Sequence, residues 1–355
     1  MSTLTDPLGA TCPAPHAETE RVLLGHGSGG RLSARLLADL VLPALGEAAA
    51  ELDLDDAALL RRPDGYVLTT DSFVVDPLEF PGGDIGALAV HGTVNDLAMR
   101  GAEPTALAVS LIIEEGLDLA LLRRIVASLG RAATAAGVPV VTGDTKVVPR
   151  GCADKLFITT TGIGARDPRT RCAASAIRPG DAVLLSGPIG LHGITVLAAR
   201  GDLGFDAGPE LHSDTRSLHR LVRTLLDTAT SDIRALRDPT RGGLASALNE
   251  LAAASDVGIE IDETAVPIPE VVAAACELLG LDPLHVANEG CAVVVTSPES
   301  ADAVLAAMRS RPEGEAAVRI GTATADHPRR VTMRTLMGAS RVVDMLVGEQ
   351  LPRIC

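Results

Sequence analysis

The sequence predicts an α+β protein built from two layered domains, and three observations support this fold. The chain has 355 residues, which suits two domains of ordinary size. Patterns typical of strands and helices alternate from residue 65 to residue 164, as in a sheet covered by helices. The turn sequence RPGD at 178–181 then starts a second alternating series, which indicates a second domain.

The first domain is expected over residues 21–170. The segment GYVLTTDS at 65–72 has the alternation of a strand, which we expect to end on Asp71. In the helix that follows, Asp84 is the expected N-terminal cap and Gly101 the stop. The expected helices are 31–45, 84–101 and 118–136, and the expected strands are 65–72, 106–113, 138–144 and 155–164.

The second domain is expected over residues 171–339. A helix should begin at the DPTRGG motif, 238–243, and run to about residue 254. The other expected helices are 190–200, 214–228, 268–280 and 298–309, and the expected strands are 182–186, 257–262, 290–296, 317–321 and 331–335. We expect residues 340–355 to form a mobile tail and residues 1–20 a disordered leader.

The composition is that of a globular chain with an excess of negative charge. Hydrophobic residues make up 46% and charged residues 22%, enough to bury a core. The net charge of −15 and an aromatic content of 1% argue against a nucleic-acid binder, which usually has a basic face and stacking rings. A nucleotide is still compatible, because Mg²⁺, lysine and backbone amides can neutralise its phosphates locally.

The sequence predicts no membrane span. Its longest apolar runs, such as ALAVSLII at 106–113, are far shorter than the ~18 residues that a membrane helix needs. The first twenty residues have neither the basic start nor the apolar centre of a secretory signal. We therefore expect a cytoplasmic protein.

A glycine-rich segment, GHGSGG at 25–30, formally matches the dinucleotide-binding pattern G-x-G-x-x-G. That fold needs a full strand before the glycines and a second strand that ends in an acid. Only RVLL precedes the segment, so this reading is disfavoured. An ordinary flexible turn and a mobile flap whose amides wrap phosphates both stay open. The flap would use Gly27, Ser28, Gly29 and Gly30.

Carboxylates in the first domain suggest a site for a hard metal ion. Each aspartate alone is most often a cap or a turn residue. Asp96, however, lies on the apolar stripe of helix 84–101, where a carboxylate is costly unless it is paired or metal-bound. Together such oxygens suit Mg²⁺ that holds nucleotide phosphates, and Lys146 can add a positive charge. The candidate ligands are Asp55, Asp56, Asp71, Asp96 and Asp144.

Two motifs in the second domain each allow a structural and a functional interpretation. The segment RDPTRGG places Asp238 and Arg241 where a helix begins, as a cap or as a site for an anion. The segment ANEG places Glu289 just before a strand, in a tight turn or as a general base. Spacing alone leaves both alternatives open.

The chain terminates in LPRIC, with a cysteine at position 355. This is not a prenylation signal, because that motif needs three further residues after the cysteine. A cysteine at the last position by chance is the other interpretation, and it is the more common explanation for a terminal cysteine. Arg353 is a nearby cation that favours a thiolate, and Pro352 stiffens the approach to it. A tail that starts near Thr335 can extend about 65–70 Å, far enough for a carrier arm that visits more than one site.

Several motifs together resemble one known family. They are HGSGG, TTDSFVVDPLEFPGGDIG, GTVNDLAMRGAEP, VTGDTKVV, DPTRGGLA, ANEG and the terminal PRIC. The combination is similar to the HypE family of hydrogenase maturation factors, from about residue 21 to the last residue. Motifs such as GDTK occur across the wider PurM-like (AIR-synthetase-related) superfamily, whereas PRIC is far more specific.

The resemblance implies an ATP-dependent carbamoyl dehydratase with two PurM-like domains. The N-terminal domains would bind ATP and Mg²⁺ and pair across a homodimer, joining their sheets. A HypF-like carbamoyltransferase would load the terminal thiol. The protein would then dehydrate the thiocarboxamide to a thiocyanate, and the cyanide would pass to iron on a HypC–HypD-like complex, as a ligand for [NiFe]-hydrogenase.

The resemblance also implies roles for individual residues. Cys355 would carry the substrate, Glu289 would be the leading candidate for the base, and Asp238 and Arg241 would shape the tail pocket. The five aspartates would hold Mg²⁺–ATP, with Asn95 and Lys146 beside them. His91 stands where relatives often have cysteine, so we expect it to serve packing only, and Cys12 in the leader has no expected role.

Other functions remain as alternatives. A selenophosphate synthetase would have a reactive cysteine near the N-terminal glycines, and a thiamine-phosphate kinase has no use for a terminal cysteine. A carrier scaffold that only transports a group on Cys355 belongs to a different class. ATP hydrolysis that depends on the carbamoylated tail would separate the enzyme from the carrier.

Overall fold

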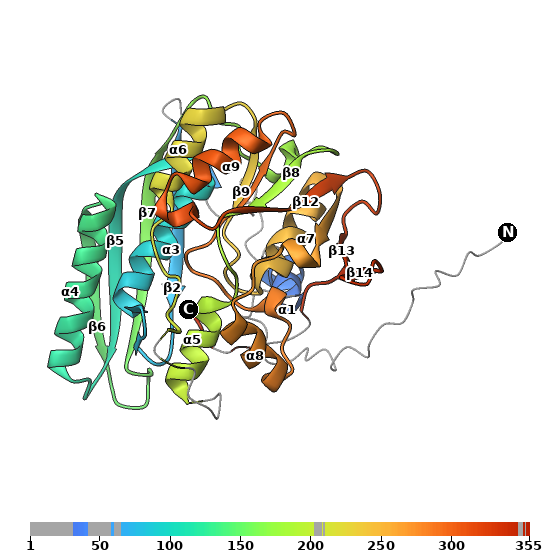
Figure 1. Ribbon diagram of the computed structural model, residues 1–355. Helices are drawn as coiled ribbons and strands as arrows, with labels where there is room; N and C mark the ends of the chain where they lie inside the picture. Colours follow the sequence, from blue (N-terminus) through green and yellow to red (C-terminus); the bar gives the residue numbers. More distant parts are fainter. Residues whose placement is uncertain are drawn as a thin grey trace.

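A computed structural model describes residues 31–41, 58–59, 65–201, 208, 210–346, 351 and 353–355. Within them the chain forms two main sheets, the first to the left and the second to the right in Figure 1. The leader, the glycine segment 25–30 with Gly27, Ser28, Gly29 and Gly30, and the pair Asp55 and Asp56 lie outside the described residues.

The N-terminal sheet has the strand order β1-β2-β7-β5-β6. Two helices, α3 and α4, pack on one face of it, and their apolar side chains share a core with the sheet. The opposite face carries exposed Tyr66, Leu68 and Ile112, and no described element covers it. The elements are β1 (Ala58–Leu59), β2 (Tyr66–Phe73), α3 (Ile85–Met99), β5 (Ala102–Glu114), α4 (Leu119–Ala136), β6 (Val140–Val148) and β7 (Leu156–Arg166).

Helix α3 lies between the N-terminal sheet and the C-terminal domain. Asp84 caps it, because its Oδ1 accepts hydrogen bonds from the amides of Gly86 (2.8 Å) and Ala87 (2.9 Å). The helix ends at Arg100 and Gly101, whose φ of 67° favours glycine. The predicted cap and stop are both confirmed.

The C-terminal sheet has the strand order β14-β13-β10-β12-β8-β11-β9 and is buried on both faces at its centre. Alternate residues of one strand point to opposite faces. Val183 and Leu185 therefore pack with α7, and Ala182 and Leu184 pack with α6 and α9. The strands are β8 (Ala182–Leu185), β9 (Ile233–Arg237), β10 (Gly258–Asp262), β11 (Val293–Thr296), β12 (Val318–Thr324), β13 (Val331–Arg334) and β14 (Ser340–Val343). The helices are α5 (Leu191–Arg200), α6 (His219–Ala229), α7 (Gly243–Ser255), α8 (Glu270–Leu279) and α9 (Ala301–Arg309).

Smaller elements complete the described chain. A short hairpin forms from β3 and β4, and the first described helix changes from α-helical to π-helical geometry. These elements are α1 (Arg31–Arg35), the π-helix (Leu36–Val41), β3 (Glu79–Phe80) and β4 (Gly83–Asp84).

Four expectations about the strands need correction. Strand β2 does not end on Asp71, because Phe73 continues the alternation and pairs with Ile158. Strand β6 continues beyond Asp144 to Val148. Strand β9 was not predicted. The expected tail begins too early, because Ser340–Val343 form β14, an edge strand that pairs with β13 across a turn with Gly338 at φ 79°.

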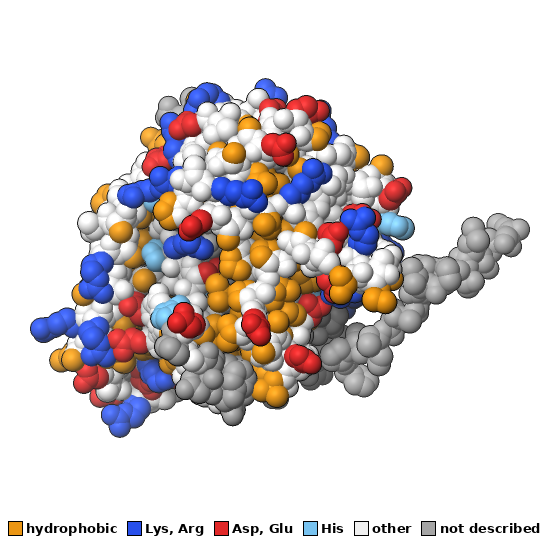
Figure 2. Space-filling model, in the orientation of Figure 1, with side chains coloured by type: hydrophobic (Ala, Val, Ile, Leu, Met, Phe, Trp, Pro, Cys, Tyr) orange, Lys and Arg blue, Asp and Glu red, His pale blue; other side chains and the backbone are white. Residues whose placement is uncertain are grey.

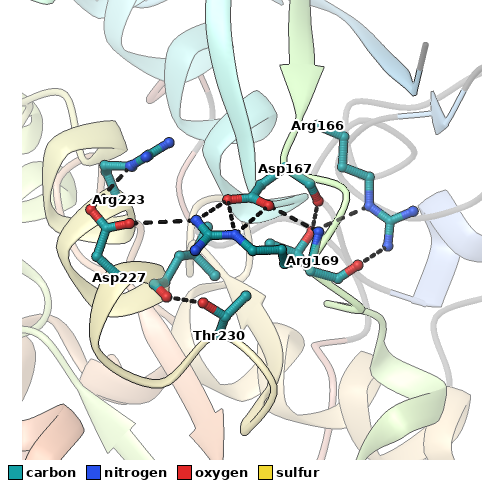
Figure 3. Close-up of polar contacts among 8 residues, drawn as sticks. Arg166, Asp167, Arg169, Arg223, Asp227 and Thr230 are labelled. Atoms are coloured by element: carbon teal, nitrogen blue, oxygen red, sulfur yellow. Dashed lines mark hydrogen bonds and ion pairs between the residues drawn. The ribbon is translucent and has the colours of Figure 1, made fainter.

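The link between the domains is tied by exposed ion pairs. Figure 3 shows Arg169 between Asp167, which follows β7, and Asp227 of α6. Arg223 reaches the same Asp227 carboxylate at 3.1 Å. Because these arginines are more than half exposed, each pair contributes little, about 0–1 kcal/mol. The pairs therefore set the path of the linker more than they stabilise the fold.

On the face shown in Figure 2, basic and acidic side chains are interspersed, and hydrophobic side chains gather near its centre. This face therefore has no single basic stripe of the kind that tracks a nucleic-acid backbone. Among the described helices, none has both the length and the apolar character needed to span a bilayer.

The cap of α3 gives a first prediction. Asp84→Ala leaves the Gly86 and Ala87 amides without their acceptor and should lower the free energy of unfolding by about 1 kcal/mol. Urea unfolding followed by circular dichroism measures this change. Asp84→Ser keeps a capping oxygen and should stay close to wild type. An equal loss in both variants would show that the cap is not the cause.

Candidate active site at the docked C-terminus

A cavity of about 260 Å³ opens between the two domains. Strand β2 and helix α3 line it from the N-terminal domain, and the DPTRGG segment and Glu289 line it from the C-terminal domain. Cys355, the last residue of the chain, also lines the cavity. The lining residues are Thr69, Thr70, Asp71, Gly92, Asp96, Arg237, Asp238, Thr240, Arg241, Gly243, Ala247, Glu250, Glu289 and Cys355.

The last residues are docked in this structure. They run antiparallel to the segment after β2, because the Val74 amide donates to the Cys355 carbonyl (3.0 Å) and the Asp76 amide donates to the Arg353 carbonyl (3.2 Å). Ile354 is 4% exposed and Cys355 is 8% exposed. The end of the expected tail is therefore buried in this structure. Its mobility stays a prediction.

Arg241 is the cation beside the thiol. Its Nη1 lies 3.8 Å from Cys355 Sγ. Burial raises the pKa of the Cys355 thiol to about 12, although Arg241 opposes that rise. Arg353 does not favour the thiolate as expected, because its guanidinium points away to the Val74 carbonyl (3.0 Å) and the Asp154 carboxylate. The docked thiol is therefore protonated and a poor nucleophile.

Glu289 is the buried acid of the cavity. It is 3% exposed, and its Oε1 has no hydrogen-bond partner among the described residues. Burial, followed by the nearby Asp238 and Asp71, raises the pKa of Glu289 well above its ordinary value. A raised pKa makes the carboxylate a stronger base and lowers its ionised fraction at neutral pH.

Asp214 holds Glu289 in place. Its carboxylate accepts hydrogen bonds from the amides of Glu289 and Gly290, each at 3.0 Å. A Cβ at position 290 would lie 1.8 Å from the Asp214 carbonyl oxygen, so only glycine fits there. The helix predicted from residue 214 therefore begins only at His219, because the segment before it is not helical and its Asp214 binds the ANEG turn.

Asn95 lies behind the cavity and does not line it. It is 1% exposed, its Nδ2 donates to the Arg216 carbonyl (3.0 Å) and its Oδ1 accepts from the Leu218 amide (2.7 Å). These bonds occupy both ends of the amide. In the described structure Asn95 therefore braces the segment that carries Asp214.

Two predicted acids from the first domain do meet in the cavity. Asp71 on β2 and Asp96 on α3 both line it, and Thr69 Oγ1 donates to Asp96 Oδ2 at 2.8 Å. Gly92 allows α3 to pack closely against β2, because a Cβ at position 92 would lie 2.9 Å from Phe73 Cζ. Thr69 was not predicted as a site residue, although strand alternation places it on the same face as Asp71.

Asp144 and Lys146 do not join them. Asp144 pairs in register with Ser110, which lies on the uncovered face of the sheet, while Asp71 points to the helix-covered face. Three strand spacings also separate β6 from β2, about 14 Å. Lys146 Nζ instead bonds Asp144 Oδ1 at 2.8 Å. The expected cluster is therefore divided between two faces.

A hard metal ion would find oxygen donors in the cavity. Asp71 and Asp96 offer carboxylates of the type that Mg²⁺ prefers. Among the described residues, however, no group of three or more histidines, cysteines or acids is arranged to hold a metal. Asp71 and Asp96 thus offer oxygen donors, and Asp55 and Asp56, which were expected to complete a magnesium site with them, lie outside the described residues.

His91 agrees with its expected packing role. Its Nδ1 lies 3.1 Å from Thr215 Oγ1, and burial lowers its pKa to about 4, so the ring is neutral. It does not line the cavity.

The chain matches known families over most of its length. Family models described as the N-terminal and C-terminal domains of AIR synthase related proteins match residues 54–165 and 178–334. The carbamoyl dehydratase HypE of Azotobacter vinelandii is 53% identical over 330 residues, 93% of this chain and 96% of that protein. The HypE of Escherichia coli K12 is 44% identical and covers 94% of this chain and 99% of its own.

Solved structures agree with these matches. A HypE–HypF complex aligns with a TM-score of 0.82 and 46% identity, over 88% of this chain and 99% of that chain. A hydrogenase maturation protein HypE in complex with ATP aligns with a TM-score of 0.79 and 49% identity, over 94% of this chain and 100% of that chain. A thiamine monophosphate kinase from Aquifex aeolicus, 20% identical with a TM-score of 0.60, shares the fold alone.

The acids of the cavity give a prediction about stability and pH. Burial, followed by the nearby charge of Asp71, raises the pKa of Asp238 to about 6 from its ordinary 3.8. The folded state therefore binds this proton more tightly than the unfolded state, and the associated stability is lost as the pH rises from about 4 through about 6. Asparagine does not titrate, so Asp238→Asn does not lose this stability. The free energy of unfolding of Asp238→Asn relative to wild type should therefore increase by on the order of 2–3 kcal/mol between pH 4 and pH 7.

Urea unfolding at a series of pH values measures this difference. Asp262→Asn is the matched control, because side-chain hydrogen bonds from Thr264 and Arg334 lower the pKa of Asp262 to about 2. Its stability difference from wild type should stay constant between pH 4 and pH 7. If the curve for Asp238→Asn also ran parallel to wild type, the raised pKa of Asp238 would be wrong.

Proposed function

Because the chain belongs to the HypE family of carbamoyl dehydratases, within the AIR synthase related proteins, we propose that it dehydrates a carbamoyl group carried on its own Cys355. The product would be a thiocyanate, formed with ATP as the phosphoryl donor and the carbamoyl oxygen as the acceptor. The single observation that carries this proposal is the position of the Cys355 thiol, inside an acid-lined cavity between two domains.

The reaction is chemically balanced by phosphate transfer. The carbamoyl oxygen attacks the γ-phosphorus of ATP, ADP leaves, and the loss of one N–H proton gives an O-phosphorylated imidate. The C–O bond then breaks, phosphate leaves with the electron pair, and the second N–H proton is lost, which leaves S–C≡N. Phosphorylation is needed because the oxygen of an amide is otherwise a poor leaving group.

The cavity has groups suited to each requirement. Glu289 is the proposed proton acceptor, because it is buried beside Cys355 with one carboxyl oxygen unbonded among the described residues. Arg241 is proposed to hold the thiocarboxamide sulfur, since its Nη1 already lies 3.8 Å from Sγ. Asp238 is proposed to shape the pocket around the nitrogen.

ATP is proposed to bind against the N-terminal side of the cavity. Asp71 and Asp96 would hold a Mg²⁺ ion, which would supply charge neutralisation for the phosphates. Asp55, Asp56 and the flap Gly27–Gly30 keep their proposed roles in nucleotide binding on the strength of the sequence. A HypE relative that binds ATP, 49% identical to this chain, supports the choice of nucleotide.

Asp144 and Lys146 fit this scheme through a second copy of the chain. They lie on the uncovered face of the N-terminal sheet, beside exposed Ile112, which pairs in register with Lys146. We propose that two copies join these faces in a homodimer. Lys146 would then meet the phosphates bound by the partner, and Asn95 would act only as a brace.

The partners follow from the order of the chemistry. A HypF-like carbamoyltransferase must load the thiol before dehydration, and a relative in complex with HypF, 46% identical, supports this partner. An iron-carrying HypC–HypD-like complex would accept the cyanide for [NiFe]-hydrogenase. Both partners require the tail to leave its dock, and the cytoplasmic location stays a prediction.

The decisive experiment is mass spectrometry of the C-terminal peptide. The protein is incubated with a carbamoyl donor system, with and without ATP and Mg²⁺, and cleaved before Asp344 to release residues 344–355. We expect a carbamoyl increment on Cys355, followed by an ATP-dependent loss of one water. Cys355→Ser should show neither change.

Two outcomes would contradict the proposal. A carbamoyl increment that persists with ATP and Mg²⁺ would favour a carrier that only transports the group. An unmodified Cys355 in the presence of an active donor system would remove the substrate from the tail.

The role of Glu289 gives a separate prediction. Glu289→Gln keeps the shape of the side chain but cannot accept a proton, so dehydration of a loaded tail should slow at least 100-fold, while loading is unchanged. The measurement is the rate of water loss from the loaded peptide. Glu260→Gln, on the exposed face of β10, is the matched control and should retain the wild-type rate. A normal rate in Glu289→Gln would assign the base elsewhere.

A further inference from the structure

Helix α5 touches the docked tail at both of its ends, although neither contact residue lines the cavity. His192 near its start donates from Nε2 to the Ile354 carbonyl at 2.8 Å. Arg200, its last residue, donates from Nη2 to the Arg353 carbonyl at 3.0 Å. The C-terminus and α5 lie side by side in Figure 1. The site described above uses neither residue.

His192 is held in one orientation and one tautomer. Its Nδ1 accepts from Ser213 Oγ at 2.7 Å, and Ser213 Oγ accepts from the Thr215 amide at 3.1 Å. The ring of Phe80 packs edge-on against it, with ring centroids 5.5 Å apart. The side chain is fully buried, and burial lowers its pKa, so the ring stays neutral with its proton on Nε2. It is therefore a fixed donor aimed at the tail.

Arg200 joins the tail to the N-terminal domain. Its Nε donates to the Asp76 carbonyl at 2.9 Å, while its Nη2 holds the Arg353 carbonyl. The segment that carries Asp76 also pairs with the tail through its own amides. One planar guanidinium thus binds both strands of this pair through two nitrogens, a geometry that the single nitrogen of a lysine does not reproduce.

The helix surface also leaves room for the tail. Position 193 is glycine, and a Cβ there would lie 3.2 Å from Leu351 Cδ1 and 2.6 Å from Val286 Cγ1. The backbone of α5 can therefore approach the tail more closely than a larger residue would allow.

We propose that α5 positions the substrate arm, and that His192 and Arg200 set the register in which Cys355 enters the cavity. The two side chains bind carbonyls next to Cys355 and not its sulfur, so they act through the tail and are positioning residues. Loading the sulfur does not alter these carbonyls, and free and carbamoylated tails dock in the same register. The inference adds positioning residues to the proposed dehydratase function. Only the second of the two tests below depends on that function.

The first test measures how fast Cys355 reacts with iodoacetamide in the full-length protein. Residues 344–355 are released by cleavage before Asp344 and quantified by mass spectrometry. In wild type the docked thiol should react more slowly than Cys152, which is exposed. Arg200→Ala and His192→Phe should each raise the rate at Cys355 roughly tenfold, as expected when the lost hydrogen bonds favour a released tail.

Controls within the chain separate release of the tail from unfolding. Cys172, Cys276 and Cys291 are buried and should stay protected in every variant, while Cys152 keeps its rate. His192→Gln retains a donor near Nε2 and should stay near wild type. Arg223→Ala removes an exposed guanidinium from α6, distant from α5 in Figure 1, and should change nothing.

The second test compares loading with dehydration. Arg200→Ala and His192→Phe should lower the rate of ATP-dependent water loss from a loaded tail and leave carbamoyl loading equal or faster. Because alkylation needs neither ATP nor a donor, a failure of the dehydratase proposal leaves the first test intact.

Two results would overturn the inference. One is an unchanged alkylation rate at Cys355 in both Arg200→Ala and His192→Phe. If Arg200→Ala also exposes the three buried cysteines, Arg200→Lys decides: an intermediate rate supports the inference, and a wild-type rate overturns it.

Discussion

The arrangement of the site depends on one cation that lines the cavity. Arg241 lies among the thiol of Cys355 and the carboxyls of Asp71, Glu289 and Asp96, and these groups raise its pKa. The buried acids Glu289 and Asp238 are less costly beside this guanidinium, which partly offsets the effect of burial on their pKa values. Both domains supply these acids, so the charge balance at Arg241 also holds the two halves of the cavity together. A change at any one of them alters the protonation of the rest.

Much of the fold could be predicted from local patterns. The capping role of Asp84, the stop at Gly101 and the helix after DPTRGG depend on neighbouring residues only, and the structure confirms them. The edge strand Ser340–Val343 could not be identified in this way. It is short and largely exposed, and it forms only because β13 offers a partner and Gly338 allows the turn. Pairing across a turn is a tertiary property that a pattern of period two does not contain.

The candidate site shows the same division. The motifs indicated Asp71, Asp96, Asp238, Arg241, Glu289 and Cys355, and the structure places all of them around one cavity. Asp144 was grouped with them because it ends a strand-like segment, but its register with Ser110 places its side chain on the other face of the sheet. The role assigned to Arg353 failed for a related reason. Nearness in sequence to Cys355 says nothing about direction, and its guanidinium turns toward Asp154.

His192 and Arg200 hold the tail through backbone carbonyls, which a reaction at the sulfur leaves unchanged. In the proposed reaction, a thiocarboxamide and the thiocyanate made from it would therefore make the same contacts with α5. ATP cleavage would give the reaction its direction, but these contacts would not help to release the product. Release would then depend on the partner that withdraws the arm, so its arrival would govern turnover.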